Sequence, residues 1–236
     1  MRRRPFALIL ASLLAIAIAV ITLAATQWDA VRSAYPRHNP FADLNVTDAP
    51  TFATRFKLLR VRTNEAYCRR ALETSALRVQ SVPDNPLEDG CGYENAVRIQ
   101  RGAAALSSSF LATCPLAVSF AMFEQHVAVP SARDVLGSEL RSIEHVGSYV
   151  CRNIAGRDRR SDHATARAVD LTAFTLADGR RIRIDGNWNT ATAESNFLLR
   201  LRDGACRYFA TVLGPGYNRQ HADHFHLGAG GFMACR

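Results

Sequence analysis

Two short stretches of the chain concentrate the residue types that bind metal ions and move protons. Residues 161–171 read SDHATARAVDL and place His163 seven residues before Asp170. Residues 221–228 read HADHFHLG and hold three of the seven histidines in the chain. If residues 224–228 are extended, His224 and His226 share one face and Phe225 points to the other, because side chains alternate along a strand.

Asp170 lies in the apolar run AVDLTAF, where a carboxylate on a strand is costly unless a positive group receives it. A metal ion would be such a partner. Nitrogen and oxygen ligands from three side chains suit zinc with one open coordination position, which is typical of catalytic zinc sites. We therefore expect Zn²⁺ to be held by His163, Asp170 and the His-x-His pair, whereas His126 and His145 are expected to have no ligand role.

The elements that would position these residues alternate between helical and extended patterns. Helices are expected over residues 63–76, 114–129 and 190–214, the last because Phe197, Leu201, Ala205 and Phe209 recur every four residues. Strands are expected over residues 95–100, 141–152, 167–176, 180–185 and 224–228, with Asp178-Gly179 favouring a hairpin. This mixture predicts an α+β domain with a mostly antiparallel sheet and flanking helices.

The first 25 residues form a targeting or anchoring segment. Pro5 to Ala25 carries no charge and follows Arg2, Arg3 and Arg4. A helix of this length reaches across the roughly 30 Å of a bilayer core, so an uncleaved anchor is expected, and a cleavable signal stays open because Ala24 and Ala25 are small. Either way the arginines keep the N-terminus in the cytoplasm. The domain would lie in the periplasm, on a single-pass inner-membrane anchor or secreted after cleavage.

The rest of the chain divides into a linker and one domain. Residues 26–52 mix proline, asparagine and aspartate without sustained periodicity, which is typical of a tether. Residues 53–236 form the expected globular domain, and 48% apolar residues in the chain are enough to fill its core.

The cysteines agree with export. There are six, an even number with no Cys-x-x-Cys spacing: Cys68, Cys91, Cys114, Cys151, Cys206 and Cys235. Three disulfides are expected, with buried free thiols as the alternative. Cys68 with Cys91 and Cys206 with Cys235 would close modest loops and are the expected pairs.

The charge is moderately basic. The net charge is +8, but three of the 29 basic residues precede the apolar segment, so 26 basic residues face 21 acidic ones in the exported part. A mild positive excess favours an anionic envelope partner such as peptidoglycan. Because the basic residues are scattered and not interleaved with aromatic ones, no nucleic-acid partner is expected.

Residues 161–170 also carry a resemblance. SDHATARAVD resembles the Ser-x-His-x-x-Gly-x-Ala-x-Asp motif of the D-alanyl-D-alanine carboxypeptidase and dipeptidase family, with Ala166 in place of the glycine. Together with CPLA, GSYVCR, DGRRIRI, LGPGYNRQHADHFHL and the last cysteine, it makes residues 50–236 resemble the extensin-like C-terminal domain family of bacterial envelope proteins. That family is grouped with lysostaphin-type peptidases and hedgehog domains. The resemblance implies a hedgehog/DD-peptidase-like zinc fold.

The same resemblance implies a role for each residue of the two motifs. His163, Asp170 and His226 would be the zinc ligands, and Asp223 would stand where the carboxypeptidases place a glutamate base. Aspartate is shorter by one methylene, and an offset of three residues from His226 would turn it to the opposite face of a regular strand. Asp223 is therefore the position that departs most from the family pattern.

The remaining roles concern the substrate. Arg152 would hold the substrate carbonyl, and His224 would stabilise the oxyanion or share the base role. Ser161 and His221, which border the two motifs, complete the expected substrate-binding set. These assignments imply a zinc-dependent hydrolase of peptidoglycan stem-peptide amide bonds, either a DD-carboxypeptidase or an endopeptidase.

Two other classes of function stay open. The first is a non-catalytic module in which zinc stabilises the fold or holds peptidoglycan or a protein partner. The second is a non-haem iron oxygenase, because two histidines and one carboxylate also form a facial triad. An exported domain rich in disulfides is a poor place to maintain ferrous iron, which disfavours the oxygenase.

Overall fold

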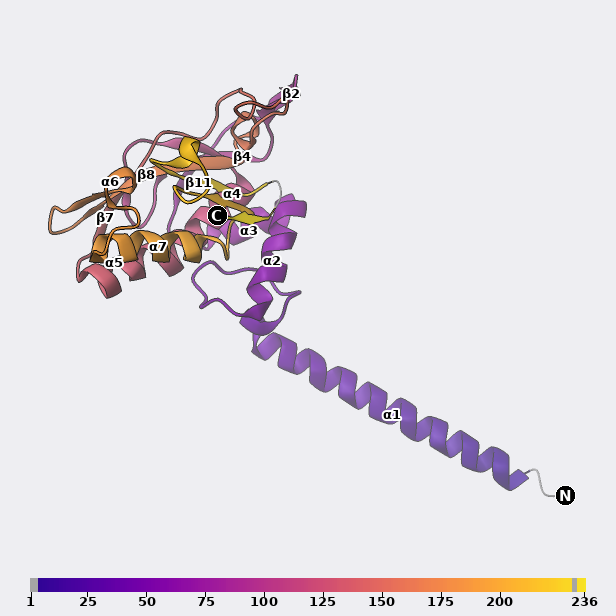
Figure 1. Cartoon of the computed structure of the whole chain (residues 1–236). Helices are drawn as coiled ribbons and strands as arrows, with labels where there is room; N and C mark the ends of the chain where they lie inside the picture. The colour runs from indigo at the N-terminus through magenta and orange to yellow at the C-terminus, as the bar shows by residue number, and fades with distance from the viewer. Residues whose placement is uncertain (1–3, 231–232) are drawn as a thin grey trace.

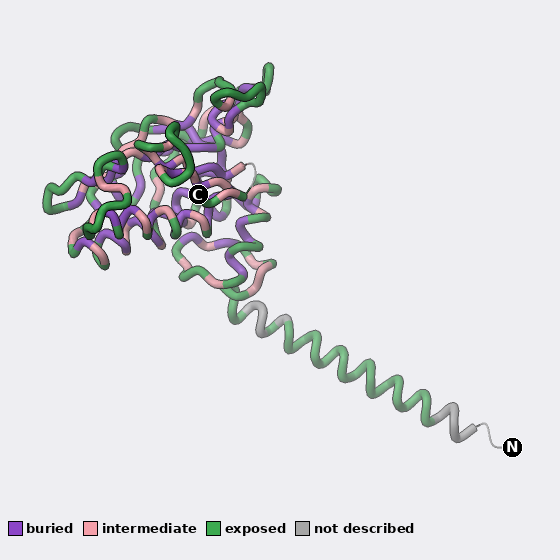
Figure 2. The backbone as a smooth tube through the Cα atoms, in the orientation of Figure 1, coloured by how far each residue is buried: buried purple, intermediate pink, exposed green. Residues whose placement is uncertain are grey.

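The N-terminal helix projects away from the globular part of the chain. The computed structural model describes residues 4–230 and 233–236, without the side chains of residues 4–8, 29 and 31–33. Helix α1 (Arg4–Ala34) leaves the domain as a single long rod that is exposed wherever its side chains are described (Figures 1 and 2). Within it, Ile9–Trp28 is long and apolar enough to cross a membrane, as an anchor or a signal sequence would be. Arg2 and Arg3, used above to orient the span, lie outside the described residues.

The segment that follows α1 is attached to the domain. It begins with a short 3₁₀ helix, η1 (Pro36–His38), and leads to helix α2 (Phe52–Thr63). Lys57 of α2 is buried, and its Nζ donates to the backbone oxygens of Pro36 at 2.8 Å and Asp43 at 3.1 Å. Leu44 and Val46 are buried as well. The stretch expected as a tether is therefore helical at its start and packed against the domain at its end.

Two helices meet where one was expected over residues 63–76. Helix α2 ends at Thr63, and α3 (Glu65–Glu73) begins two residues later. Asn64 separates them with an extended backbone, and its side chain accepts a hydrogen bond from the backbone N–H of Tyr67 at 2.8 Å. Asparagine is a strong N-cap, so this position starts a new helix instead of continuing the old one.

The helix expected over residues 114–129 is longer than predicted. Helix α4 (Cys114–Phe123) carries Pro115 in its first turn, as predicted, and continues through a π turn, η2 (Glu124–Ala128), into α5 (Val129–Leu136). Gly137 ends it with a left-handed backbone. Buried Glu124 accepts a backbone hydrogen bond from Ala104 at 2.8 Å, which ties this helix to the loop before β5.

The helix expected over residues 190–214 is shorter than predicted. After a short helix α6 (Ile184–Asn187), α7 spans Ala193–Ala205. At Gly204 any Cβ would collide with Val127 of η2, so the two helices touch there. The chain then turns, and residues 211–213 form a strand. Phe209 fits the four-residue apolar spacing because it is buried in the core. It lies after the turn at residues 206–208, however, and not in a helix.

The main sheet is mostly antiparallel, as predicted. In the described part of the chain its order is β12, β10, β11, β8, β7 and β5, with β9 beside β8, and only β10–β12 and β5–β7 are parallel pairs. The bounds of its strands are β5 Ala105–Leu106, β7 Leu140–His145, β8 Ala168–Leu176, β9 Arg181–Arg183, β10 Thr211–Leu213, β11 Phe225–Gly228 and β12 Ala234–Cys235. The hairpin from β8 to β9 forms through Gly179 as expected, whereas β7 stops at His145, just before the positive-φ Gly147.

Smaller sheets flank the main one. Strands β1 (Arg78–Ser81), β4 (Ala96–Arg101) and β6 (Phe110–Thr113) form an antiparallel sheet, and β2 (Asn85–Glu88) pairs with β3 (Cys91–Tyr93). Helices α5 and α7 run along the main sheet (Figure 1). On that face, Phe197 of α7 meets Phe174 of β8 edge to face with ring centroids 5.5 Å apart. The domain combines helices with mostly antiparallel sheets, which makes it α+β, as predicted.

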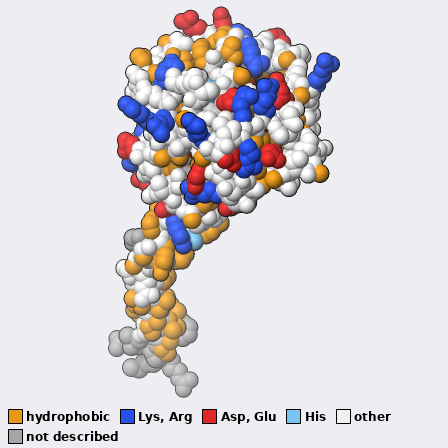
Figure 3. Space-filling view, turned by 90° about the vertical axis from the view of Figure 1, so that its left-hand side faces the viewer, with side chains coloured by type: hydrophobic (Ala, Val, Ile, Leu, Met, Phe, Trp, Pro, Cys, Tyr) orange, Lys and Arg blue, Asp and Glu red, His pale blue; other side chains and the backbone are white. Residues whose placement is uncertain are grey.

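Charge is dispersed over the face of the domain that is seen in Figure 3. Figure 3 shows basic and acidic side chains interspersed on one face. Several form surface ion pairs, such as Arg181 with Glu144 at 2.6 Å and Arg200 with Asp134 at 2.8 Å. No continuous basic stripe of the kind that tracks a nucleic-acid backbone is visible on that face.

All six cysteines form disulfides, as predicted, but only one expected pair is correct. Cys206 bonds Cys235, whereas the expected Cys68–Cys91 pair is wrong. Cys68 of α3 bonds Cys114 at the start of α4, and Cys91 of β3 bonds Cys151 in the loop before the histidine motif. The expectation favoured short loops, but the packing of α3 on α4 brings a more distant cysteine to Cys68.

We predict that a peptide map without reductant gives these three pairs and no free thiol. Replacing both Cys91 and Cys151 by serine should lower the free energy of unfolding by about 2–5 kcal/mol, because the unfolded chain gains freedom. Thermal unfolding of the double variant measures this loss. Alkylation of cysteines in the unreduced native protein would contradict the pairing.

The attachment of residues 36–46 also has a measurable consequence. Lys57→Ala should lower the free energy of unfolding by about 1–3 kcal/mol, because two backbone carbonyls lose their donor in a buried place. Arg78→Ala, an exposed residue on β1, is the matched control and should change stability by less than about 0.5 kcal/mol. Equal loss in both variants would mean that the segment is not held by Lys57.

Candidate functional site

Two adjacent strands of the main sheet bring Asp170 and His226 together. In the antiparallel pair of β8 and β11, Asp170 lies directly opposite His226. Their neighbours Leu171, Phe225 and Leu227 belong to the hydrophobic core. Because side chains alternate along a strand, packing these neighbours inward turns both functional side chains to the other face of the sheet.

A short 3₁₀ helix, η3 (Asp162–Thr165), carries His163 to the same face. The hydroxyl of Ser161 caps it by accepting the backbone N–H of His163 at 3.4 Å. Ala166 then reverses the chain toward β8 with φ of 51° and ψ of 30°. Alanine adopts this left-handed backbone at a cost of about 1–2 kcal/mol.

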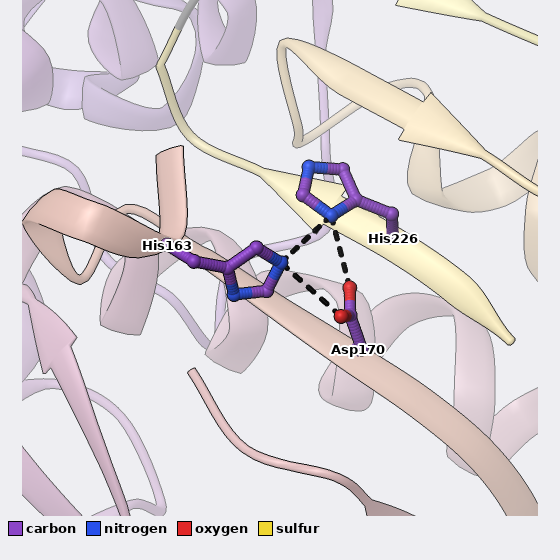
Figure 4. A group of neighbouring side chains, drawn as sticks. All are labelled: His163, Asp170 and His226. Atoms are coloured by element: carbon purple, nitrogen blue, oxygen red, sulfur yellow. Dashed lines mark hydrogen bonds and ion pairs between the residues drawn. The ribbon is translucent and has the colours of Figure 1, made fainter. Parts of the chain in front are cut away.

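The three side chains point at a common centre (Figure 4). His163 Nε2 lies 3.0 Å from His226 Nδ1 and 3.1 Å from Asp170 Oδ2, and His226 Nδ1 lies 2.9 Å from Asp170 Oδ1. One donor atom from each residue lies within 4.8 Å of the other two. Two imidazole nitrogens and a carboxylate oxygen so arranged could hold a divalent cation.

A backbone carbonyl fixes which nitrogen of His163 faces the centre. Nδ1 of His163 is 2.6 Å from the backbone oxygen of Ser148, to which it donates its hydrogen. In the neutral ring Nε2 is then the unprotonated nitrogen, available as a ligand, and this is the arrangement commonly found around metal-binding histidines. Sequence reasoning missed Ser148, because a backbone acceptor leaves no signal in residue type.

The electrostatics of the cluster favour an ionised carboxylate. Burial of Asp170 would by itself raise the pKa of its carboxyl. The hydrogen bonds and charges of His163 and His226 outweigh burial and hold that pKa well below its usual range. The Asp170 carboxylate is therefore negatively charged at neutral pH and can bind a cation.

Beside the cluster, Asp223 and His224 form a pair. Nδ1 of His224 is 2.8 Å from Asp223 Oδ1, and Nε2 of the same ring is 3.8 Å from Asp170 Oδ1. Strand β11 starts at Phe225, after the turn that follows η4 (Arg219–His221), so Asp223 precedes the strand. Its side chain is 69% exposed and points at His224, which stands between it and the cluster.

His221 lies against the same histidines. Its ring centroid is 5.2 Å from that of His224 and 5.9 Å from that of His226. Burial, followed by the neighbouring imidazoles, lowers the pKa of His221 to about 4, so the ring is neutral at physiological pH. Asn218 Oδ1 holds Nδ1 at 2.7 Å, a partner that the Asn-x-x-His spacing before the motif could have suggested.

Arg152 and Ser161 border the loop that leads to η3. The disulfide of Cys151 fastens one end of this loop to β3, and the backbone N–H of Ser161 donates to the Arg152 oxygen at 3.1 Å. The Arg152 side chain is exposed and near enough to His221 for its charge to lower the pKa of that ring. Ser161 is buried and acts on the backbone of η3, so its hydroxyl serves the position of His163.

Comparison with known proteins places the chain in a family. The model of the family described as "Extensin-like protein C-terminus" matches residues 66–236, which include both histidine motifs and all six cysteines. No curated protein and no solved structure gives a match. With most of its length covered by the family model, the chain belongs to the extensin-like C-terminal family.

Proposed function

We propose that the domain is a zinc-dependent hydrolase of amide bonds in peptidoglycan stem peptides. The observation that carries this proposal is the convergence of His163, Asp170 and His226 beside a second imidazole, His224, that is oriented by a carboxylate. A structural metal site does not need such a pair next to it. A hydrolase does, because a proton has to move from water to the leaving amine.

The cluster fits zinc. Ligand atoms at about 2.0–2.1 Å from a tetrahedral ion lie roughly 3.3 Å from one another. The separations here are 3.0, 3.1 and 2.9 Å, so small side-chain shifts are enough. Two neutral imidazoles and one carboxylate are the ligand types that zinc takes in catalytic sites, and the hydrogen bond from His163 to Ser148 supplies the outer support.

In the proposed reaction zinc would supply Lewis acidity and acidify a water molecule. His224 would accept the proton at Nε2 and return it to the leaving amine, since this nitrogen faces the cluster. Asp223 would hold Nδ1 of the same ring and stabilise the imidazolium. This assigns proton transfer to His224 and orientation to Asp223, and it removes the need for the shorter aspartate to reach the cluster itself.

Substrate would be held on the rim of the site. Arg152 is the exposed cation there and would bind a carbonyl or carboxylate of the stem peptide. His221 is neutral and would contribute a wall and a hydrogen bond instead of a charge.

We further propose that α1 anchors the chain in the inner membrane with the domain in the periplasm. Ile9–Trp28 is long enough for one crossing, and three disulfides suit an oxidising compartment outside the cytoplasm. The enzyme would then act on the peptidoglycan above the membrane that holds it.

The purified full chain, kept free of chelators, should contain about one zinc ion per molecule. His163→Ala and His226→Ala should lose it, because each removes a ligand. His145→Ala is the matched control: this histidine lies on β7, beside the strand of Asp170, but its Nε2 contacts the Ser108 oxygen, so zinc should remain. Elemental analysis gives the result, and iron in place of zinc would contradict the proposal.

Variants of His224 and Asp223 separate proton transfer from metal binding. His224→Ala should keep zinc and lower turnover of a peptidoglycan stem peptide by at least about 10²-fold, because the general base is lost. Asp223→Asn should keep zinc and fall between this variant and the wild type. Mass spectrometry of digested sacculi separates loss of terminal D-alanine from loss of cross-links.

If the domain is a binding module, we expect it to bind sacculi without releasing product. If the wild-type chain binds zinc and sacculi but releases no product, and His224→Ala binds sacculi equally well, the domain is a binding module and the hydrolase proposal is wrong.

A further inference from the structure

Helix α2 is apolar on its exposed face as well as on its buried one. Leu58 and Val61 face the core, yet Phe52, Phe56 and Leu59 are 69%, 54% and 51% exposed. These three recur at positions i, i+4 and i+7, so they form one stripe along the helix. A run of large apolar side chains in water is unfavourable unless something covers it.

A groove lies beside this stripe and carries unpaired positive charge. Its volume is about 700 Å³, and its walls include the stripe, Met233 and three arginines, Arg55, Arg62 and Arg207. Among the described residues, no carboxylate forms a salt bridge with any of the three. The Nε atom of Arg62 is buried without a hydrogen-bond partner. Burial lowers the pKa of this guanidinium, as expected for a cation that lacks an anion.

The other two basic residues of α2 are already satisfied. Lys57 donates to carbonyls of the segment before α2, and Arg60 donates to the Phe41 oxygen at 2.6 Å and lies over the ring of Tyr67. The helix is therefore divided by function. Lys57 and Arg60 hold the domain together, whereas Arg55 and Arg62 face the groove with the apolar stripe.

The stripe begins where α1 ends. Phe52 shares a second hollow, of about 410 Å³, with Trp28 and Tyr35 of the α1 region. Figure 1 shows α2 starting at the point where α1 meets the domain and running across the direction of α1. Tryptophan and tyrosine are enriched at the boundary of membranes with water. The apolar stripe is thus continuous with the end of the membrane-spanning candidate.

The height of α2 above the bilayer follows from the length of α1. Trp28 ends the apolar span, and α1 continues to Ala34. At 1.5 Å per residue this places the end of the helix roughly 9 Å above the hydrocarbon. The headgroup layer on each side of a bilayer is about 5–8 Å thick. Helix α2 would therefore start at the outer surface of the headgroup layer, close enough for its long exposed side chains to reach the lipid.

We propose that α2 and its groove form a docking surface for the membrane, in which anionic phospholipid headgroups bind Arg55, Arg62 and Arg207 while Phe52, Phe56 and Leu59 enter the interface. This combination of apolar and basic side chains on one helix face is typical of interfacial helices. The docking surface rests on the anchor part of the proposed function and not on zinc or hydrolysis.

Two other occupants fit less well. A second copy of this chain would bring the same three arginines to the interface and add like charges. A soluble protein would need to share the space at the end of α1 with the membrane itself. Anionic lipid supplies both the negative charge and the apolar boundary in the place where α1 puts α2.

The test uses the full chain in vesicles. A photoreactive benzoylphenylalanine replaces Phe56, or Leu59 in a second variant, since both side chains are more than half exposed. The matched control places it at Val146, which is 73% exposed in the loop after β7. Vesicles contain phosphatidylcholine alone or with an equal part of phosphatidylglycerol. We expect lipid adducts at positions 56 and 59, more of them with phosphatidylglycerol, and few at position 146.

The arginines are tested in the same vesicles. Each basic residue at an anionic surface is worth about fivefold in the binding equilibrium, so Arg55→Ala, Arg62→Ala and Arg207→Ala together should lower docking by about 10²-fold. The dependence of lipid adducts on phosphatidylglycerol should disappear. Arg78→Ala, Arg98→Ala and Arg101→Ala together remove the same charge from the exposed side of β1 and β4 and should preserve it.

Other outcomes overturn the docking surface. Adducts between two copies of the chain at position 56 would identify a dimer interface, and adduct levels equal to those at position 146 would show that α2 faces water. Anchoring is measured separately, by whether the chain stays with sedimented vesicles after a high-salt wash. A chain that washes off fails the anchor proposal, whereas a retained chain without adducts fails only the docking surface.

Discussion

The structure around the site depends on one buried carboxylate. Asp170 lies in the middle of the sheet, on a strand whose other residues are almost all apolar. A charge in that place is tolerable only with close partners, and His163 and His226 supply them from two different elements. Removing either histidine would leave the carboxylate short of a partner, so the side chains that could bind a metal also stabilise the buried charge of Asp170.

The hydrophobic core sets the geometry of that cluster. Leu171, Phe225 and Leu227 face the helices, and this packing fixes the register that puts Asp170 opposite His226. A slip of β11 by one residue would turn His226 into the core and away from Asp170. The left-handed backbone at Ala166 and the cap from Ser161 then bring His163 to the same side. Precision at the site is thus a consequence of packing on the opposite face of the sheet.

Sequence reasoning reached the parts of the fold that local pattern controls. Alternation around Phe225 placed His224 and His226 on one face, and the Asp178-Gly179 turn located the hairpin of β8 and β9. Sequence reasoning failed where contacts between distant parts of the chain determine the structure. The spacing that ends at Phe209 is helical in pattern, but α7 stops at Ala205 and the aromatic ring reaches the core from a turn. Cys68 pairs with Cys114 because two helices pack, which no spacing along the chain records.

The proposed docking surface on α2 and the hairpin tied to the rim of the proposed active site lie at different ends of the molecule. The disulfide of Cys91 with Cys151 ties the rim of the site to the β2–β3 hairpin, and Figure 1 shows this hairpin at the end of the domain remote from α1. Lys57, buried under the segment that leaves α1, fixes α2 to the domain at the other end. If α2 rests on the bilayer, the packed segment around Lys57 limits how the domain can turn, and the β2–β3 hairpin that is tied to the rim of the site points away from the lipid. A flexible tether would allow every orientation. The packed segment restricts that freedom, because Lys57 holds residues 36–43 against the domain.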